Sequence, residues 1–207
     1  AASDVYKRQV VQGARQTGKT YIIERFAEDN YEELLEINFK QMASAVDIFS
    51  GDLTVDNMVM AMRFRFPEKK ILPGKTLIFL DEIQECQEAI TSLKFWAIDN
   101  RYDVIVSGSL LGIDYKRASS YPVGYVDYLR MYGMDFEEFL WGMGISEDMI
   151  GNLCGYLESK TMIPEAIHSQ MMNYYRQYIA IGGMPEVVQK YVDTVSYTHL
   201  TLPTNSR

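Results

Sequence analysis

The chain has 207 residues, of which 47% are apolar and 23% charged, values typical of a soluble globular protein with one domain, or one domain and a small appendage. Its formal net charge of −8 argues against broad nucleic-acid binding, which normally needs a basic face. No apolar run approaches the ~20 residues needed to cross a bilayer, so no membrane segment is predicted. The two cysteines, Cys86 and Cys154, are too few for a disulfide framework and favour a reducing, cytoplasmic environment.

The two ends of the chain are expected to be non-native. Residues 1–9 and 195–207 resemble translated sequencing-adapter read-through, and they are left out of the reasoning about the fold. The alternative is a frayed N-terminus and a natural C-terminal tail. If the ends are foreign, the chain is a fragment that lacks the start of its first strand and a C-terminal region.

The stretch after the first predicted strand carries the clearest motif. Residues 13–20 read GARQTGKT and fit the pattern G-x-x-x-x-G-K-[ST] of a phosphate-binding P-loop. Val10 and Val11 before it are typical of a buried strand, and the apolar spacing after it is typical of a helix that ends near Asn30. Strand, loop and helix are the context that this motif requires. The alternative is a glycine-rich turn without a ligand.

The chemistry of a bound triphosphate explains the residue types in this loop. Glycine at positions 13 and 18 allows a tight turn whose N–H groups point inward, where a Cβ would clash. Lys19 can place its ammonium against the β- and γ-phosphate oxygens, and the Thr20 hydroxyl can hold Mg²⁺. A helix that begins here also points its positive dipole end at the phosphates. The residues predicted to bind ATP are Gly13, Ala14, Arg15, Gln16, Thr17, Gly18, Lys19 and Thr20.

Further strands and helices alternate along the chain. The predicted strands are residues 34–39, 76–80, 104–106 and 126–131, and the predicted helices between them are residues 55–66 and 88–99. Residues 40–53 are predicted to be a loop. After the last strand, Asp135 and Glu138 form the pattern of a capping box that begins a helix. The rest is predicted to be helical, with Pro164 at a first helical position.

This alternation predicts a parallel sheet in a three-layer α/β fold. Ligands of such sheets bind beyond the carboxyl ends of the strands. The P-loop, the pair Asp81 and Glu82, and residues 107–109 each follow a predicted strand and therefore fall at that edge. Their convergence at one edge is the main structural argument for a single site.

The pair Asp81 and Glu82 follows four apolar residues, which is a Walker B pattern. Asp81 can hold Mg²⁺ through a water ligand, opposite Thr20, and Glu82 can polarise a water molecule for in-line attack on the γ-phosphate. We therefore predict Glu82 and Lys19 as catalytic residues, and Thr20 and Asp81 as metal-binding residues. The alternative is that acidic residues at the end of a strand cap the next helix.

Ser107 and Ser109 are candidates to bind the γ-phosphate or the attacking water and so to sense the state of the nucleotide. A Ser/Gly turn after a strand is the equal alternative. An arginine that stabilises the charge of the transition state is also expected at such a site. The candidates, each more readily interpreted as a solvated surface residue, are Arg101, Arg117, Arg130 and Arg176.

Five motifs in order along the chain together resemble one family. They are GARQTGKT, LDEIQ, VSGS, MDFEEFL and GGMPE, at residues 13–20, 80–84, 106–109, 134–140 and 182–186. The first two are common to P-loop ATPases. The last two, in this order, resemble the bacterial and archaeal AAA-type ATPases that pair an AAA+ domain with a C-terminal nuclease-like domain of unknown function. The resemblance covers about residues 10–194.

The resemblance implies that Lys19, Thr20, Asp81 and Glu82 bind ATP and Mg²⁺, and that the sheet has the AAA+ strand order 5-1-4-3-2. The family often carries a Gly-Arg or Gly-Lys pair near position 124, whereas this chain has a tyrosine after the glycine. The resemblance therefore assigns no arginine from that segment.

The resemblance also implies a division of the chain. A P-loop ATPase core is expected over residues 10–145, followed over residues 146–194 by a helical region that begins a lid or a linker. A winged-helix and nuclease-like part would come after it, outside this chain.

The leading functional hypothesis is an ATPase whose turnover drives a conformational change. The alternative is an ATP-gated interaction switch with little turnover of its own. A small-molecule or nucleotide kinase has no lid of closely spaced arginines to support it, and a GTPase is not favoured because the chain has no Asn-Lys-x-Asp motif. The expected partner is ATP, with a homo-oligomer left open, no membrane, and nucleic acid only through the missing C-terminal domain.

Overall fold

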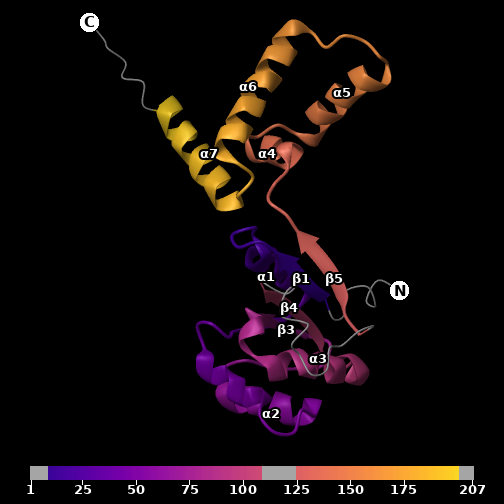
Figure 1. The fold of residues 1–207 in the computed structure, drawn as a ribbon, viewed down its shortest axis with the longest axis vertical. Coiled ribbons are helices and arrows are strands. Elements are labelled where there is room, and N and C mark those ends of the chain that lie inside the picture. Colours follow the sequence, from indigo (N-terminus) through magenta and orange to yellow (C-terminus); the bar gives the residue numbers. More distant parts are fainter. Residues whose placement is uncertain (1–8, 109–124, 201–207) are drawn as a thin grey trace, which may run out of the picture. The chain divides into compact units, whose positions relative to one another are not determined.

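The computed structural model describes residues 9–108 and 125–200, with side chains as far as residue 194 (Figure 1). Five parallel strands form one sheet in the order β2-β3-β4-β1-β5. The strands are β1 (Gln9–Gly13), β2 (Glu33–Asn38), β3 (Thr76–Asp81), β4 (Asp103–Gly108) and β5 (Asp127–Met131). From the opposite edge this is the predicted order 5-1-4-3-2, which is confirmed.

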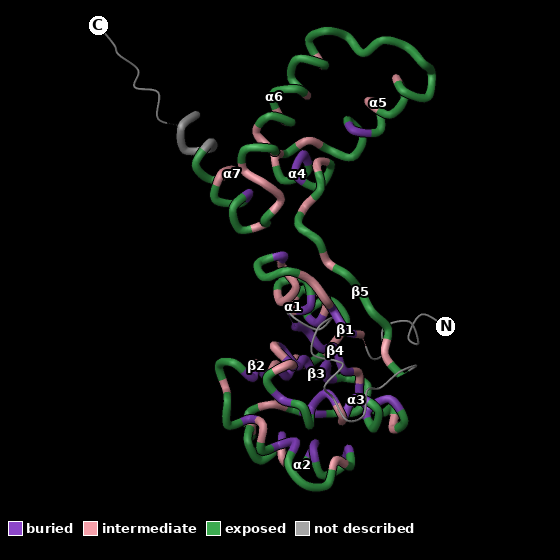
Figure 2. The backbone as a smooth tube through the Cα atoms, viewed as in Figure 1, coloured by how far each residue is buried: buried purple, intermediate pink, exposed green. Residues whose placement is uncertain are grey.

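The burial of each strand follows its place in the sheet. All six residues of β3 are buried, as expected of a central parallel strand that is covered on both faces. Four of the five residues of the edge strand β5 are exposed. Figure 2 shows this contrast between the interior of the sheet and its β5 edge.

Helices cover the two faces of the sheet and create two separate apolar clusters. On one face, α1 (Lys19–Asn30) packs Ile23 and Ala27 against Leu77 and Phe79 of β3. On the other face, α2 (Val55–Arg65) and α3 (Gln87–Asp99) pack against Ile78, Leu80 and the alternating residues of the neighbouring strands. Because successive strand residues face opposite sides, the alternating apolar residues of β3 fill both clusters. The predicted three-layer α/β fold is confirmed.

Residues 40–53 were predicted to be a loop, and that prediction is wrong. They contain the 3-10 helix η1 (Ala43–Phe49), in which Ala45, Ile48 and Phe49 are buried. Residues 45 and 48 are three apart, and this spacing places them on one face of a helix with three residues per turn. Burial of this short apolar face explains why the segment is helical despite its many polar residues.

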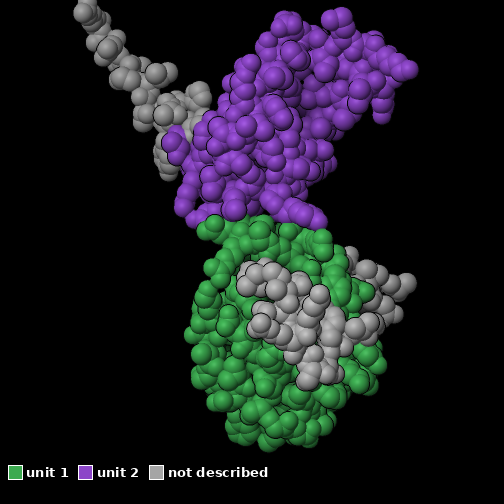
Figure 3. All heavy atoms as spheres, viewed as in Figure 1, with its two compact units in different colours: residues 1–131 green, residues 132–207 purple. Residues whose placement is uncertain are grey.

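The chain divides into two compact units, Ala1–Met131 and Tyr132–Arg207, and each is described by itself (Figure 3). The sheet and its covering helices belong to the first unit. The boundary predicted from the sequence, between an ATPase core over residues 10–145 and a helical region over residues 146–194, stays a prediction.

The second unit is helical. It consists of α4 (Phe136–Gly142), α5 (Glu147–Glu158), α6 (Glu165–Ile181) and α7 (Pro185–Leu200). The predicted capping box is present, because the Asp135 side chain accepts from the Glu138 N–H and the Glu138 side chain accepts from the Asp135 N–H. Pro164 precedes the first helical residue of α6 as its N-cap, one position before the predicted one.

No helix in the described part of the chain is both long and apolar enough to cross a membrane.

Candidate active site

A cavity of about 380 Å³ lies at the carboxyl edge of the sheet in the first unit. It is formed by the loop after β1, the start of α1, the loop after β2, and the end of β3 with the residue that follows it. Its lining residues are Arg15, Gln16, Gly18, Lys19, Thr20, Tyr21, Lys40, Asp81 and Glu82. The P-loop and the pair Asp81 and Glu82, which are distant in the sequence, therefore line one cavity.

Two glycines allow the P-loop to take its shape. A Cβ at Gly13 would lie 2.5 Å from the carbonyl oxygen of Met131 in β5, so this position has no room for a side chain. Gly18 has a φ of 84°, in the left-handed region that glycine adopts at little cost. The constraint at position 13 thus comes from the neighbouring strand, whereas the constraint at position 18 comes from the turn itself.

The first turn of α1 is built to receive an anion. The first intrahelical bond is donated by Ile22 to the Gly18 carbonyl, at 3.0 Å, so the N–H groups before it have no partner within the helix. No acidic residue lies in this first turn. The free N–H groups and the helix dipole together favour negative charge at this end.

Lys19 extends its ammonium group over the P-loop. Its Nζ donates to the carbonyl oxygens of Gly13, at 3.1 Å, and Ala14, at 2.6 Å. Burial lowers the pKa of Lys19, and the charges of Glu82 and Asp81 act in the opposite direction. The ammonium therefore lies within the electrostatic field of both carboxylates.

The remaining P-loop residues take different positions. Arg15 and Gln16 line the cavity, while Gly13, Ala14 and Thr17 are not among its lining residues. Thr17 is 4% exposed, and its hydroxyl donates to the Ala14 carbonyl at 2.9 Å. This residue braces the loop from inside.

Three hydrogen bonds fix the carboxylate of Asp81. Its Oδ2 accepts from Asn38 Nδ2 at 2.8 Å, and its Oδ1 accepts from the Glu82 N–H at 3.0 Å and from Ser107 Oγ. Asn38 and Asp81 are register partners at the ends of β2 and β3. Asn38 was not predicted as a site residue, although a polar residue at the carboxyl end of a buried strand is the signal that indicates it.

Ser107 is fully buried within β4 and contacts Asp81, and it is not among the cavity-lining residues. Ser109 and Arg117 lie outside the described residues. Arg101 is bound by Asp56 and Asp99, each at 2.7 Å, and is not among the residues that line the cavity.

Glu82 has an unusual backbone conformation. Its φ of 52° and ψ of 45° are left-handed, which a residue with a side chain adopts only at a cost. It immediately precedes the 3-10 helix η2 (Ile83–Glu85), and its Oε2 accepts a hydrogen bond from Gln84 Nε2. Such strained positions cluster at functional sites.

Lys40 is a further cationic residue at the cavity, in addition to Arg15 and Lys19, and it was not predicted from the sequence. Its backbone N–H donates to Asn38 Oδ1 at 3.0 Å, so the side chain that bonds Asp81 also fixes the loop that carries Lys40. The only sequence signal was a basic residue directly after the predicted strand at residues 34–39.

The oxygen atoms at this cavity fit Mg²⁺. Magnesium prefers oxygen ligands, keeps several waters, and is usually held by one or two protein groups together with substrate phosphates. Thr20 and Asp81 bring a hydroxyl and a carboxylate to the same cavity. Burial raises the pKa of the nearby Glu36, and the charges of Glu24 and Asp81 raise it further.

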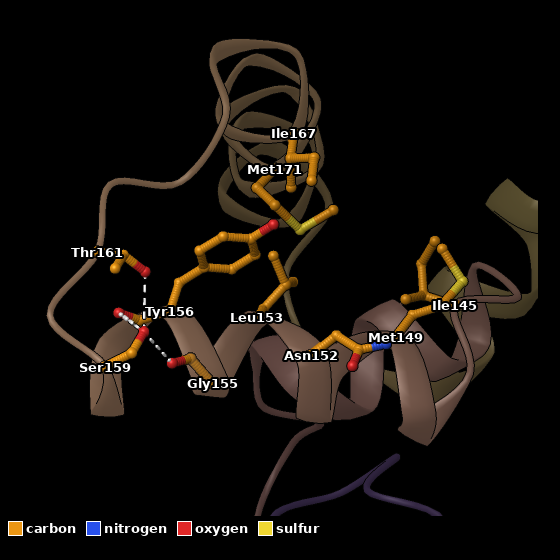
Figure 4. Close-up of a pocket in the computed structure, with 10 residues that line it drawn as sticks. All are labelled: Ile145, Met149, Asn152, Leu153, Gly155, Tyr156, Ser159, Thr161, Ile167 and Met171. Carbon is orange, nitrogen blue, oxygen red and sulfur yellow. Dashed lines mark hydrogen bonds between the residues drawn. The ribbon is translucent and has the colours of Figure 1, made fainter.

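The second unit has a larger cavity, of about 560 Å³, beside α5 and α6 (Figure 4). Its wall includes apolar residues such as Met149, Leu153 and Met171. The hydroxyl of Ser159 donates a hydrogen bond to the Gly155 carbonyl at 2.7 Å. None of the residues predicted to bind nucleotide or metal lines it. The convergent charged groups are therefore at the smaller cavity in the first unit.

Comparisons with known proteins identify a family for this chain. No curated protein matches the chain. Among solved structures, the Walker-type ATPase paby2304 of Pyrococcus abyssi is similar, with 13% identity and a TM-score of 0.46, over 96% of this chain and 69% of that chain. AMPPCP-bound DnaA from Aquifex aeolicus is similar with 9% identity and a TM-score of 0.49, over 93% of this chain and 55% of that chain. The AAA domain family matches residues 6–140, more than half of the sequence. The chain therefore belongs to the AAA domain family.

Proposed function

We propose that this protein binds Mg²⁺-ATP and hydrolyses it to ADP and phosphate, and that turnover drives a conformational change. The observation that carries the proposal is the single cavity lined by Lys19, Thr20, Asp81 and Glu82 at the start of α1. Membership of the AAA domain family supports nucleotide binding.

In the proposed binding mode, the phosphates lie against the start of α1. The backbone N–H groups of the P-loop and of the first turn donate to phosphate oxygens. The ammonium of Lys19 donates to the loop carbonyls in this structure, and in this binding mode it turns from them to the β- and γ-phosphates. Lys40, from the facing loop, adds positive charge to the same cavity.

Thr20 and Asp81 are the residues that would hold magnesium. Bound there, the metal ion would neutralise phosphate charge and orient the γ-phosphate. Asn38 and Ser107 keep the Asp81 carboxylate directed and hydrogen-bonded. Ser107 thereby acts on the site through Asp81.

Glu82 is the proposed general base. Its carboxylate accepts a proton from water as the water oxygen bonds to the γ-phosphorus and the bond between that phosphorus and the β–γ bridging oxygen breaks. ADP leaves with the bridging oxygen, and the proton returns to solvent. No electron transfer or further reactant is needed.

The direct test is to measure ATP binding and phosphate release by the purified chain, with Mg²⁺ and with excess EDTA. We expect binding and slow phosphate release that EDTA abolishes, since an in-line transfer without the metal leaves the phosphate charge uncompensated. A chain that does not bind ATP would contradict the proposal. Clear binding with ATP-dependent self-association and no phosphate release would favour the alternative, an ATP-gated interaction switch.

From the sequence resemblance we propose that the AAA domain belongs to a longer protein with a nuclease-like C-terminal domain, which the complete reading frame tests. We also propose that the domain can form a homo-oligomer, which gel filtration with and without ATP tests. The cytoplasmic location stays a prediction from the two cysteines.

Replacement of Lys40 by alanine is expected to weaken ATP binding modestly. An exposed charge pair contributes about 0.2–1 kcal/mol, so the Kd should rise by about fivefold or less, and high salt should reduce the difference. Titration with a fluorescent ATP analogue at low and high salt measures this. The matched control is Gln41→Ala, because Gln41 is the exposed next residue and does not line the cavity. An equal loss in both variants would contradict a role for the Lys40 charge.

A further inference from the structure

We infer that Gln84 is a positioning residue that sets the direction of the Glu82 carboxylate. The inference rests on the proposed role of Glu82 as the base. Gln84 follows Glu82 by two positions and lies within η2. It is not among the residues that line the cavity, whereas Glu82 is. Its influence on the reaction therefore passes through Glu82.

The turn that carries Gln84 is firmly held. The Glu85 N–H donates to the Glu82 carbonyl at 3.0 Å, and the Cys86 N–H donates to the Ile83 carbonyl at 3.0 Å. Ile83 and Cys86 are both buried, which anchors the turn in the core. This short helical turn returns the Gln84 side chain to Glu82, where Nε2 donates to Oε2.

The amide of Gln84 is satisfied at one end. Its Nε2 has Glu82 as partner, but its Oε1 is buried and accepts no hydrogen bond from the described residues. The cost of leaving that buried oxygen without a donor offsets what the hydrogen bond to the Glu82 carboxylate contributes to folding, so an apolar side chain of similar shape would serve folding about as well. Folding stability therefore does not explain the amide, whereas the bond to Glu82 does.

The amide also selects one arrangement of the carboxylate. Reversal of the amide would place its oxygen against the Glu82 oxygens, and two acceptors repel each other. Nε2 of Gln84 engages Oε2 of Glu82, and Glu82 lines the cavity. In the proposed arrangement, Oε1, the oxygen that Gln84 does not bind, accepts the proton from water. Gln84 thus reduces the number of orientations that the base samples, and positioning of this kind contributes to rate.

The test combines Gln84→Met, which removes the amide and keeps a similar shape, with Gln84→Leu as a second variant. We expect kcat for ATP to fall by about 10-fold in both, a fraction of what a general base contributes in all. KM, ATP affinity and melting temperature should stay within error of the unmodified chain. The matched control, Gln87→Met, changes an exposed glutamine at the start of α3 and should leave kcat unaltered.

A double-mutant cycle with Glu82→Gln separates positioning from a general structural effect. In the Glu82→Gln background, Gln84→Met should cause no further loss, because the base on which Gln84 acts is gone. A similar loss in both backgrounds would overturn the inference. So would an unaltered kcat, a loss of ATP affinity, or a clear fall in melting temperature in Gln84→Met and Gln84→Leu. If Glu82→Gln alone keeps full turnover, the proposed function of Glu82 fails and the inference fails with it.

Discussion

Replacement of Glu82 by glutamine is expected to lower kcat for ATP hydrolysis by about 100- to 1000-fold, the range that a general base contributes. The amide keeps the size of the side chain but cannot accept a proton from water. ATP affinity should be unchanged, since phosphate binding is assigned to the P-loop, Lys19 and Lys40. A protein that binds ATP and retains it should result.

Phosphate release under saturating ATP, together with equilibrium binding of a fluorescent ATP analogue, separates the two effects. The control is Glu85→Gln, an exposed glutamate of the same turn that does not line the cavity. Its kcat should equal that of the unmodified chain. Full turnover by Glu82→Gln would remove Glu82 from its proposed role as the base.

Replacement of Lys19 by methionine is expected to weaken ATP binding by about 10- to 100-fold, because hydrogen bonds to a charged group contribute about 1.5–3 kcal/mol and about 1.4 kcal/mol is a factor of ten. In the proposed binding mode the ammonium, which donates to the carbonyls of Gly13 and Ala14 in this structure, turns to the phosphates. Methionine preserves the aliphatic stem and removes the charge.

Calorimetric titration with Mg²⁺-ATP measures the affinity, and circular dichroism confirms that the variant is folded. Lys94→Met, on the exposed surface of α3, is the matched control and should bind as the unmodified chain does. An unaltered affinity in Lys19→Met would mean that the phosphates lie elsewhere, and with it the proposed binding mode would fail.

The strands of the sheet could be predicted from the sequence because the pattern of apolar residues that marks a strand is local and periodic. The continuous apolar run at residues 76–80 can be satisfied only where both faces of a strand are covered, and β3 is buried throughout. The capping box at Asp135 is likewise a local device, since its two partners are three residues apart. The strand order came from the family resemblance.

Residues whose position depends on tertiary structure were missed. Asn38 was placed in a strand, but its contact with Asp81 requires the register of β2 and β3, which a single sequence does not give. Lys40 lines the cavity from the loop after β2, and its backbone N–H donates to Asn38 Oδ1, a contact between backbone and side chain that a single sequence does not give. The contact of Gln84 with Glu82 follows a left-handed backbone at Glu82, and the intrinsic preferences of glutamate do not predict that conformation. The roles predicted for the site residues stay predictions until the variants are measured.

At position 82, the left-handed backbone makes folding stability and ATP hydrolysis favour different residues. Glycine there would relieve a conformational cost of the order of 1 kcal/mol while removing the proposed base. Selection for thermal stability alone would therefore favour glycine at position 82. The selected variants would be more stable and would hydrolyse little ATP. Libraries built on this scaffold need a selection for phosphate release alongside the selection for survival at high temperature.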